Sequence, residues 1–397
     1  MNLPRHSQIW LPSYIKHRLS SLARKPAKRL WLLFADHYEP LWNGADEQTG
    51  AERVARWALR WPAIAAKFQD SAGRPPRYTF FYPEEEYRPR LLEPLERMAS
   101  DGIADVEVHL HHDGEGQQNF VERISRFTET LVSRHGLLRK YKGKVAFGFI
   151  HGLWALDNSR PDGRFCGLNN EISLLRDLGC YADFTMPSGA SPTQAHMINT
   201  IYWAVDDPGK PKSYDTGVPV TPGGTATGDL MMIPGPLGLR WGQRVLPRIE
   251  HSELCSYDPA SAYRVRRWLE LAPRIGDDIF LKLFTHGTQE RHSQYLLGGG
   301  LELTLSLIAA ECQRVGLDLH FSTAWEMRQA VDAAVRGEGH FVPQADRGRD
   351  NRAEERYGTM DRASDLHKIH HACGDAGSIA NRRAAGTTAD RGFPLAR

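Results

Sequence analysis

The stretch VEVHLHHDGE, residues 106–115, places three histidines and an aspartate at the end of a β-rich run. Strand alternation sends His109 and His111 to one side, and His112 and Asp113 begin the loop that follows. Imidazoles and carboxylates this close together are ligands for Zn²⁺ and related ions, whereas a lone histidine is more often structural. Because active sites of (β/α) barrels lie at the carboxyl ends of strands, the stretch predicts part of a divalent-metal site in a hydrolase barrel. A purely structural or solvated cluster is the alternative.

Short β-rich runs alternate with helical stretches over residues 28–335, which is typical of an α/β domain. The expected strands are Leu30–Phe34, Arg77–Tyr82, Val106–Leu110, Val145–Ile150, Ala182–Met186, Asp278–Phe284 and Asp318–Phe321. The expected helices are Phe120–Tyr141, Asn170–Leu178, Pro259–Leu271 and Leu301–Val315. Roughly seven or eight strands, most of them followed by a helix, predict an α/β fold of the irregular (β/α)7–8 barrel type.

Three other segments flank or interrupt this domain. Residues 1–27 form a basic arm with interleaved apolar side chains, which would either pack on the domain or lie on an anionic membrane surface. The Gly- and Pro-rich interval at about 188–250 predicts a long excursion of loops over one face. Residues 336–397 are polar and charged with little apolar periodicity, and they predict a mostly disordered tail.

Composition narrows the class of protein. With 397 residues, of which 41% are hydrophobic, the chain is typical of a soluble globular enzyme. Its 50 basic and 48 acidic side chains leave a net charge of +2, which argues against nucleic acid as a partner. Five cysteines without a CxxC pair indicate reduced thiols. Because no apolar run approaches the roughly 18 residues of a membrane span, we expect a cytoplasmic protein, with residues 1–27 as an optional contact to the inner face of the membrane.

A second strand end carries ligand chemistry. In LLFADHYEP, residues 32–40, an apolar run leads directly into Asp36, His37 and Glu39. Asp36 could bind a metal ion or act as a base, and His37 could bind a metal ion. A turn in which Asp36 caps a backbone amide is the structural alternative.

Two more strand ends finish in histidine. In KLFTHG, residues 282–287, His286 would suit general acid catalysis, because the pKa of imidazole lies near neutrality. In FGFIHGLWALDNSRPDG, residues 147–163, His151 follows an apolar strand and precedes aromatic and polar side chains. Aromatic residues beside carboxylates are common sugar platforms, although they are equally common in protein cores.

The order of these elements resembles the polysaccharide deacetylase superfamily, carbohydrate esterases that remove N- or O-acetyl groups from glycans. That family's first strand ends in an aspartate pair, where LLFADH stands here, and its second reads ATFF, where YTFF stands at 78–81. Its third strand ends in a histidine motif with ligands four residues apart, where this chain has HLHHD at 109–113. A later leucine-x-histidine strand end is matched around His286, whereas FIHG replaces an aromatic motif that carries Arg and Pro. The resemblance covers about residues 28–330, apart from 188–250.

The resemblance implies a divalent metal, Zn²⁺ in the first place. The implied ligands are His109, either Asp113 or His111, and either Asp36 or His37. If Phe34 aligns with the family's phenylalanine, the catalytic-base position falls on Ala35 and the metal aspartate on Asp36. A register that slips by one makes Asp36 the base and His37 the ligand. Asp113 stands where the family has its second histidine.

The activity that the resemblance implies is metal-dependent removal of N-acetyl groups from sugars of a surface polysaccharide or its precursor, as in exopolysaccharide biosynthesis. Asp36 would take the proton of the attacking water and His286 would protonate the departing amine. His151, near the position of the missing arginine, is the third expected catalytic residue. One alternative is another metal hydrolase, of the amidohydrolase or phosphoesterase type, which uses an HxH pair such as HLH at 109–111. The other is a non-catalytic glycan-binding or assembly protein, which Ala35 would support.

Overall fold

A large, mostly parallel sheet forms the centre of the computed structural model, which describes residues 4–141, 143–241, 247–339 and 341. Its strands, in the order in which they lie side by side, are β12 (Arg274–Ile275), β13 (Asp278–Thr285), β1 (Arg29–His37), β2 (Tyr78–Pro83), β3 (Ala104–Leu110), β5 (Lys144–His151), β6 (Cys180–Asp183), β9 (Leu230–Met232), β7 (Tyr202–Ala204) and β8 (Gly217–Pro219). Off this path, β4 (Arg139–Tyr141) pairs with β5 and β14 (Asp318–Phe321) with β1, and β10 (Gly238–Arg240) and β11 (Arg248–Glu250) form a separate antiparallel pair. The predicted α/β class is confirmed, but strand pairing within the described residues does not close the sheet into a barrel.

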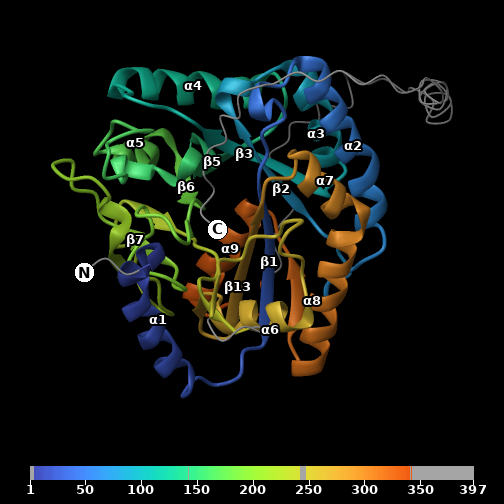
Figure 1. The fold of residues 1–397 in the computed structure, drawn as a ribbon, viewed down its shortest axis with the longest axis vertical. Helices are drawn as coiled ribbons and strands as arrows, with labels where there is room; N and C mark the ends of the chain where they lie inside the picture. The colour runs from blue at the N-terminus through green and yellow to red at the C-terminus, as the bar shows by residue number, and fades with distance from the viewer. Residues whose placement is uncertain (1–3, 142, 242–246, 340, 342–397) are drawn as a thin grey trace, which may run out of the picture. The chain divides into compact units, whose positions relative to one another are not determined.

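Helices pack on both faces of this sheet. Those that follow the strands are α2 (Glu47–Ala65), α3 (Pro89–Ser100), α4 (Gln117–Ser133), α5 (Glu171–Leu178), α6 (Ala262–Leu271), α7 (Glu290–Tyr295), α8 (Leu301–Val315) and α9 (Ala324–Arg336). Strand β1 shows how the faces divide: Leu32 and Phe34 join the core beneath α2 to α8, whereas Leu33 and Ala35 join a second core with α9. Figure 1 shows α2, α3, α7 and α8 along one side, and α9 between β6 and β13. We call the face that carries α9 the inner face.

A strand forms at each of the seven expected places, although β6 covers Cys180–Asp183 instead of Ala182–Met186. Most of these runs are buried on both faces, whereas β14 begins at the exposed Asp318. The interval 188–250 differs from the expected loops, since β9, β7 and β8 extend the sheet beyond β6. Each of these strands has three residues, which is too short for an alternating pattern to be visible in the sequence.

The N-terminal arm forms α1 (Ser7–Ser21) and packs on the domain. Trp10 and Tyr14 are buried against Leu237 and Leu271, whereas Leu19 is exposed. Of the two expectations for this arm, packing on the domain is therefore what the structure shows for Trp10 and Tyr14.

The longest helical run, Glu290–Val315, is long and apolar enough by length and composition to cross a membrane. Its buried side chains, such as Leu305 and Ile308, belong to the core beneath the sheet. A buried core helix of a globular domain has the same length and apolar composition. Of the predicted tail 336–397, residue 340 and residues 342–397 lie outside the described residues.

A side chain bridges the two sides of the sheet that strand pairing leaves open. Lys282 on β13 donates hydrogen bonds from its buried Nζ to the backbone oxygens of Phe184 and Met186, the second at 2.6 Å. The oxygen of Met186 also accepts from the amide of Gly235, which follows β9, at 3.0 Å. The inner face is thus curled around buried polar groups, although its backbone ladder stays open.

Candidate metal centre

Histidines from three strand ends converge on the inner face. His37 is the last residue of β1, His109 lies near the end of β3, and His286 directly follows β13. Because β13, β1, β2 and β3 run parallel, their carboxyl ends share one edge of the sheet. The ring centroid of His37 lies 5.2 Å from that of His109 and 4.7 Å from that of His286.

A carboxylate joins these imidazoles into one group. Glu39, two residues after β1, has donor atoms within 4.8 Å of those of His37 and His286 on one side, and of those of His109 and His111 on the other. Its Oε1 lies 3.4 Å from Nε2 of His109 and 3.5 Å from Nε2 of His111. We call these five residues, His37, Glu39, His109, His111 and His286, the strand-end group.

The protonation states of this group suit a metal ion. Nδ1 of His109 lies 2.7 Å from the backbone oxygen of Ile150, so this nitrogen carries a proton and Nε2 is the atom that would bind a metal ion. Burial, together with the nearby His286 and His109, lowers the pKa of His37 well below its ordinary value and keeps its ring neutral. Although burial opposes ionisation, the hydrogen bond with His109 and the neighbouring histidines lower the pKa of Glu39 to about 2. Neutral imidazoles and an ionised carboxylate are the forms that bind divalent metals.

His111 differs from the other members because solvent reaches it. Its side chain is 31% exposed, and its Nδ1 bonds to Oε1 of Glu85, which follows β2. Burial lowers the pKa of His111, but Glu85 and Glu39 outweigh burial and raise it. A pocket of about 320 Å³ adjoins the ring and is lined by His111, His112, Asp113, Gly152, Leu153 and Phe165. This is the side from which a substrate could approach the strand-end group.

Trp154 covers another side of the group. Its ring centroid lies 5.6 Å from that of His37 and 5.9 Å from that of His286. Both Trp154 and the preceding Leu153 have positive φ, 55° and 54°, a conformation that bulky side chains rarely adopt. Such strain persists only where the surrounding structure holds it.

Asp36 lies on the opposite face of β1, although it was a candidate ligand and base. Its Oδ1 accepts from the amide of Gly287 at 2.7 Å, and its Oδ2 accepts from the hydroxyl of Tyr78 at 2.9 Å. Burial raises the pKa of Asp36 to about 8, in spite of these hydrogen bonds. Since β1 continues through His37 instead of ending at Phe34, alternation sends Asp36 away from the strand-end group.

Two further candidates lie outside the strand-end group. Oδ1 of Asp113 accepts from the backbone amide of Phe165 at 2.7 Å, so Asp113 holds a loop. His151, expected to be catalytic, is fully buried and faces His112 in a separate cluster. The structure thus brings together His37, His109, His111 and His286, and it leaves Asp36, Asp113 and His151 apart.

Three glutamates of the site were given no role from the sequence, although Glu39 was noted after the first strand. Glu39 stands in the LLFADHYEP stretch, and Glu85 follows the buried strand YTFFYP, so a polar residue after an apolar strand was the available signal in both cases. Glu253, whose Oε1 lies 4.0 Å from Nδ1 of His286, comes from an irregular segment without such a signal.

No family model matches the chain, and no curated protein matches it. The donor set itself indicates the chemistry of the site. Buried imidazoles with one carboxylate suit Zn²⁺ and neighbouring divalent ions better than Ca²⁺ or Mg²⁺, which take oxygen ligands.

Proposed function

We propose that this protein is a metal-dependent deacetylase, of the polysaccharide deacetylase type, that removes N-acetyl groups from sugars of a surface polysaccharide or its precursor. The observation that supports this best is the convergence of His37, His109 and His286 from three parallel strand ends, in the chain order of that family's motifs. In this proposal the curled sheet corresponds to the family's irregular barrel.

His37, Glu39 and His109 would hold the metal, because they are the most buried members of the strand-end group. When bound there, a divalent ion such as Zn²⁺ would polarise the acetyl carbonyl and lower the pKa of water toward about 7. His109 is already oriented for this by its hydrogen bond to the oxygen of Ile150.

Two histidines beside these ligands would move protons. His111, backed by Glu85, stands at the pocket and would take the proton of the attacking water. His286, with Glu253 4.0 Å from its Nδ1, would protonate the departing amine. Each imidazole thus has a carboxylate that can stabilise its protonated form. The base role moves from Asp36 to His111 because both oxygens of Asp36 are engaged on the other face of β1.

Trp154 would bind the sugar. Its ring closes the site above His37 and His286, and an indole face is apolar enough to stack on a pyranose ring and to exclude water from the reacting bond. We place the reaction in the cytoplasm, where thiols stay reduced, since the four described cysteines are free and buried.

Acetate release from N-acetylhexosamine polymers, measured together with the metal content of the purified protein, tests this proposal. We expect acetate release that disappears on metal removal and returns on adding Zn²⁺. A metal-loaded protein that releases no acetate from any such polymer would contradict the proposal and favour a glycan-binding role.

A second candidate is a metal hydrolase of the amidohydrolase or phosphoesterase type. It is favoured by one observation, that both histidines of the HLH pair, His109 and His111, face Glu39. Hydrolysis of a panel of phosphoesters, without acetate release from the glycans, would establish it in place of the deacetylase.

A further inference from the structure

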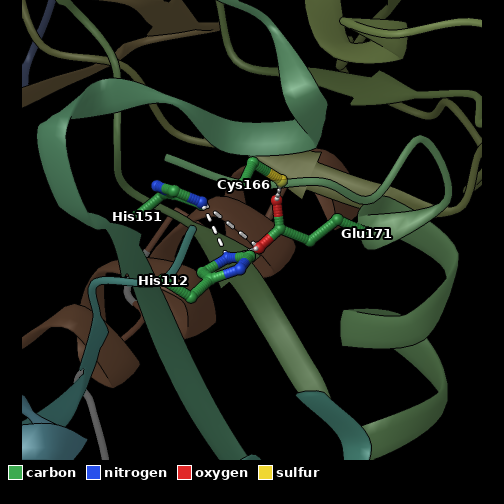
Figure 2. Close-up of side chains that lie close together, drawn as sticks. All are labelled: His112, His151, Cys166 and Glu171. Carbon is green, nitrogen blue, oxygen red and sulfur yellow. Dashed lines mark hydrogen bonds and ion pairs between the residues drawn. The ribbon is translucent and has the colours of Figure 1, made fainter. Parts of the chain in front are cut away.

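A second cluster of donor atoms lies beside the strand-end group and shares no residue with it. It consists of four residues. His112 lies in the loop after β3, and His151 is the last residue of β5. Cys166 lies in the loop after β5, and Glu171 is the first residue of α5. Figure 2 shows the four side chains pointing toward one another. All four are buried, and their donor atoms lie within 4.8 Å of one another. We call them the interior cluster.

The spacing of these atoms is close to that of a metal coordination shell, with the two nearest pairs shorter than in such a shell. Nε2 of His151 lies 2.9 Å from Nε2 of His112 and 3.6 Å from Oε1 of Glu171. Oε1 of Glu171 lies 3.1 Å from Nε2 of His112, and its Oε2 lies 3.4 Å from Sγ of Cys166. A tetrahedral Zn²⁺ ion, with Zn–N of about 2.1 Å and Zn–S of about 2.3 Å, sets its donors roughly 3.3–3.6 Å apart.

The hydrogen bonds of the cluster do not explain its geometry without a cation. Nδ1 of His151 lies 2.6 Å from the oxygen of Gly152 and carries that ring's proton, so Nε2 of His151 is a lone pair. This lone pair and the Glu171 carboxylate both face Nε2 of His112, which has a single proton to share between them. Nδ1 of His112, also buried, has no hydrogen-bond partner among the described residues. A cation at the centre would bind Nε2 of both imidazoles and the carboxylate, and Nδ1 of His112, which lies 3.9 Å from Oε2 of Glu115, would then carry that ring's proton.

We propose that His112, His151, Cys166 and Glu171 bind a second metal ion, Zn²⁺, in a closed structural centre. A thiolate with two imidazoles favours Zn²⁺ over Mg²⁺ or Ca²⁺. Four protein ligands leave no position for water or substrate, which is typical of structural zinc sites. This centre does not depend on the proposed deacetylase reaction.

The centre has a definite task, which is to hold the strained loop that carries Trp154. Oε2 of Glu171 accepts from the amide of Asp157 at 2.6 Å, and Sγ of Cys166 accepts from the amide of Asn158 at 3.2 Å. Asp157 and Asn158 both have φ of 51°, so the loop adopts left-handed backbone at these positions as well as at Trp154. The metal would fix this loop, and the loop places Trp154 over the strand-end group.

Cobalt substitution tests the proposal directly. In the full-length protein loaded with Co²⁺, we expect the thiolate-to-cobalt charge-transfer absorption of a cysteine ligand. The absorption should vanish in Cys166→Ser and persist in Cys312→Ser, which alters another buried cysteine. It should also persist in His109→Ala, which belongs to the strand-end group. Absence of this absorption from the wild-type protein would overturn the proposal, as would its persistence in Cys166→Ser.

Metal counting gives a second readout that does not depend on spectroscopy. We expect Glu171→Gln to lower the zinc content by about one equivalent and to increase proteolysis of the 152–166 loop. If Glu171→Gln fails to fold, the wild-type cobalt spectrum still decides. A folded Glu171→Gln variant with wild-type zinc content would contradict the assignment of this ligand.

Discussion

His111 and His112 are neighbours in the chain, yet their imidazoles enter two different groups. Nε2 of His111 lies 3.5 Å from Glu39 in the strand-end group, whereas Nε2 of His112 lies 3.1 Å from Glu171 in the interior cluster. Strand β3 ends at Leu110, and the chain turns so that consecutive side chains diverge. A substitution that moves His111 can therefore also move His112, because a single peptide bond joins them. Experiments must distinguish effects on the strand-end group from effects on the interior cluster.

Replacing His109 with Ala should remove one metal ion and abolish turnover. His109 is fully buried, and its Nε2 faces Glu39, so its loss leaves too few donors in the strand-end group. We expect the metal content to fall by about one equivalent. Elemental analysis of the purified variant measures this. His135→Ala is the matched control, because His135 is also buried but pairs with Tyr87 outside both groups. Unchanged metal content in His109→Ala would refute the site assignment.

A chelator should remove the two metals at different rates. His111 gives solvent a route to the strand-end group, since its side chain is 31% exposed, whereas the histidine and glutamate side chains of the interior cluster are inaccessible. We expect a fast phase of metal loss that parallels the loss of activity, followed by a slow phase. Zinc release followed with a colorimetric indicator measures both phases. Loss of both ions in one phase would show that the interior cluster is not closed.

Replacing Gly152 with Ala should impair turnover while the metal content stays the same. A Cβ atom at Gly152 would overlap the ring of His111, so the ring must move from its place beside Glu85. If His111 is the base, turnover should fall by about 10²-fold or more. Gly116→Ala is the control, since a Cβ there meets no atom within 4 Å. Acetate release per metal-loaded protein is the measurement. Loss of metal from Gly152→Ala would instead make His111 a ligand.

The docking of α1 should weaken as the pH falls from about 6.5 to about 4. Burial, together with the charges of Arg24 and Arg18, lowers the pKa of His17 from 6.5 to about 4. The folded state binds the neutral ring, so protonation below pH 6.5 favours detachment. The full effect is on the order of 3 kcal/mol, reached near pH 4. Trp10 lies on α1 and is buried against the domain, so its fluorescence, or proteolysis within α1, reports the detachment.

The variant His17→Gln provides the control for this pH dependence. Gln does not ionise, so its α1 should stay docked over the same pH range. An equal pH dependence in the two proteins would show that another group controls the docking.

The fold could be predicted from the sequence where strands are long and doubly buried. Runs such as Leu30–Phe34 and Asp278–Phe284 are mostly apolar segments between helical patterns, and each corresponds to a strand of the sheet. The short strands β7 to β9 could not be predicted, because pairing at the sheet edge, and not a local pattern, makes them extended. Closure of a barrel is likewise a long-range property that no single segment encodes.

The site could be predicted only where the sequence showed which face of a strand each side chain occupies. His109 and His111 were placed on one side by alternation, and they lie together. Asp36 was expected at the site because the first strand was expected to end at Phe34. In the structure the strand continues for three more residues, to His37, so the side chain of Asp36 points to the opposite face of the sheet. Cys166 and Glu171 come from a loop and a helix start that carry no metal-ligand spacing, so their meeting with His112 depends on the folded chain.

The contacts of Lys282 have a consequence for the local opening of the sheet. The buried Nζ of Lys282 donates to the backbone oxygens of Phe184 and Met186, at a place where no ladder of the described strands joins β13 to β6. Segments joined by one side chain can separate without breaking a backbone ladder, so local opening costs less there than between β1 and β13, which are joined by a parallel ladder. Amide hydrogen exchange would then be faster along residues 184–186 than in β1. The easiest motion of the inner face is therefore a widening between β13 and residues 184–186.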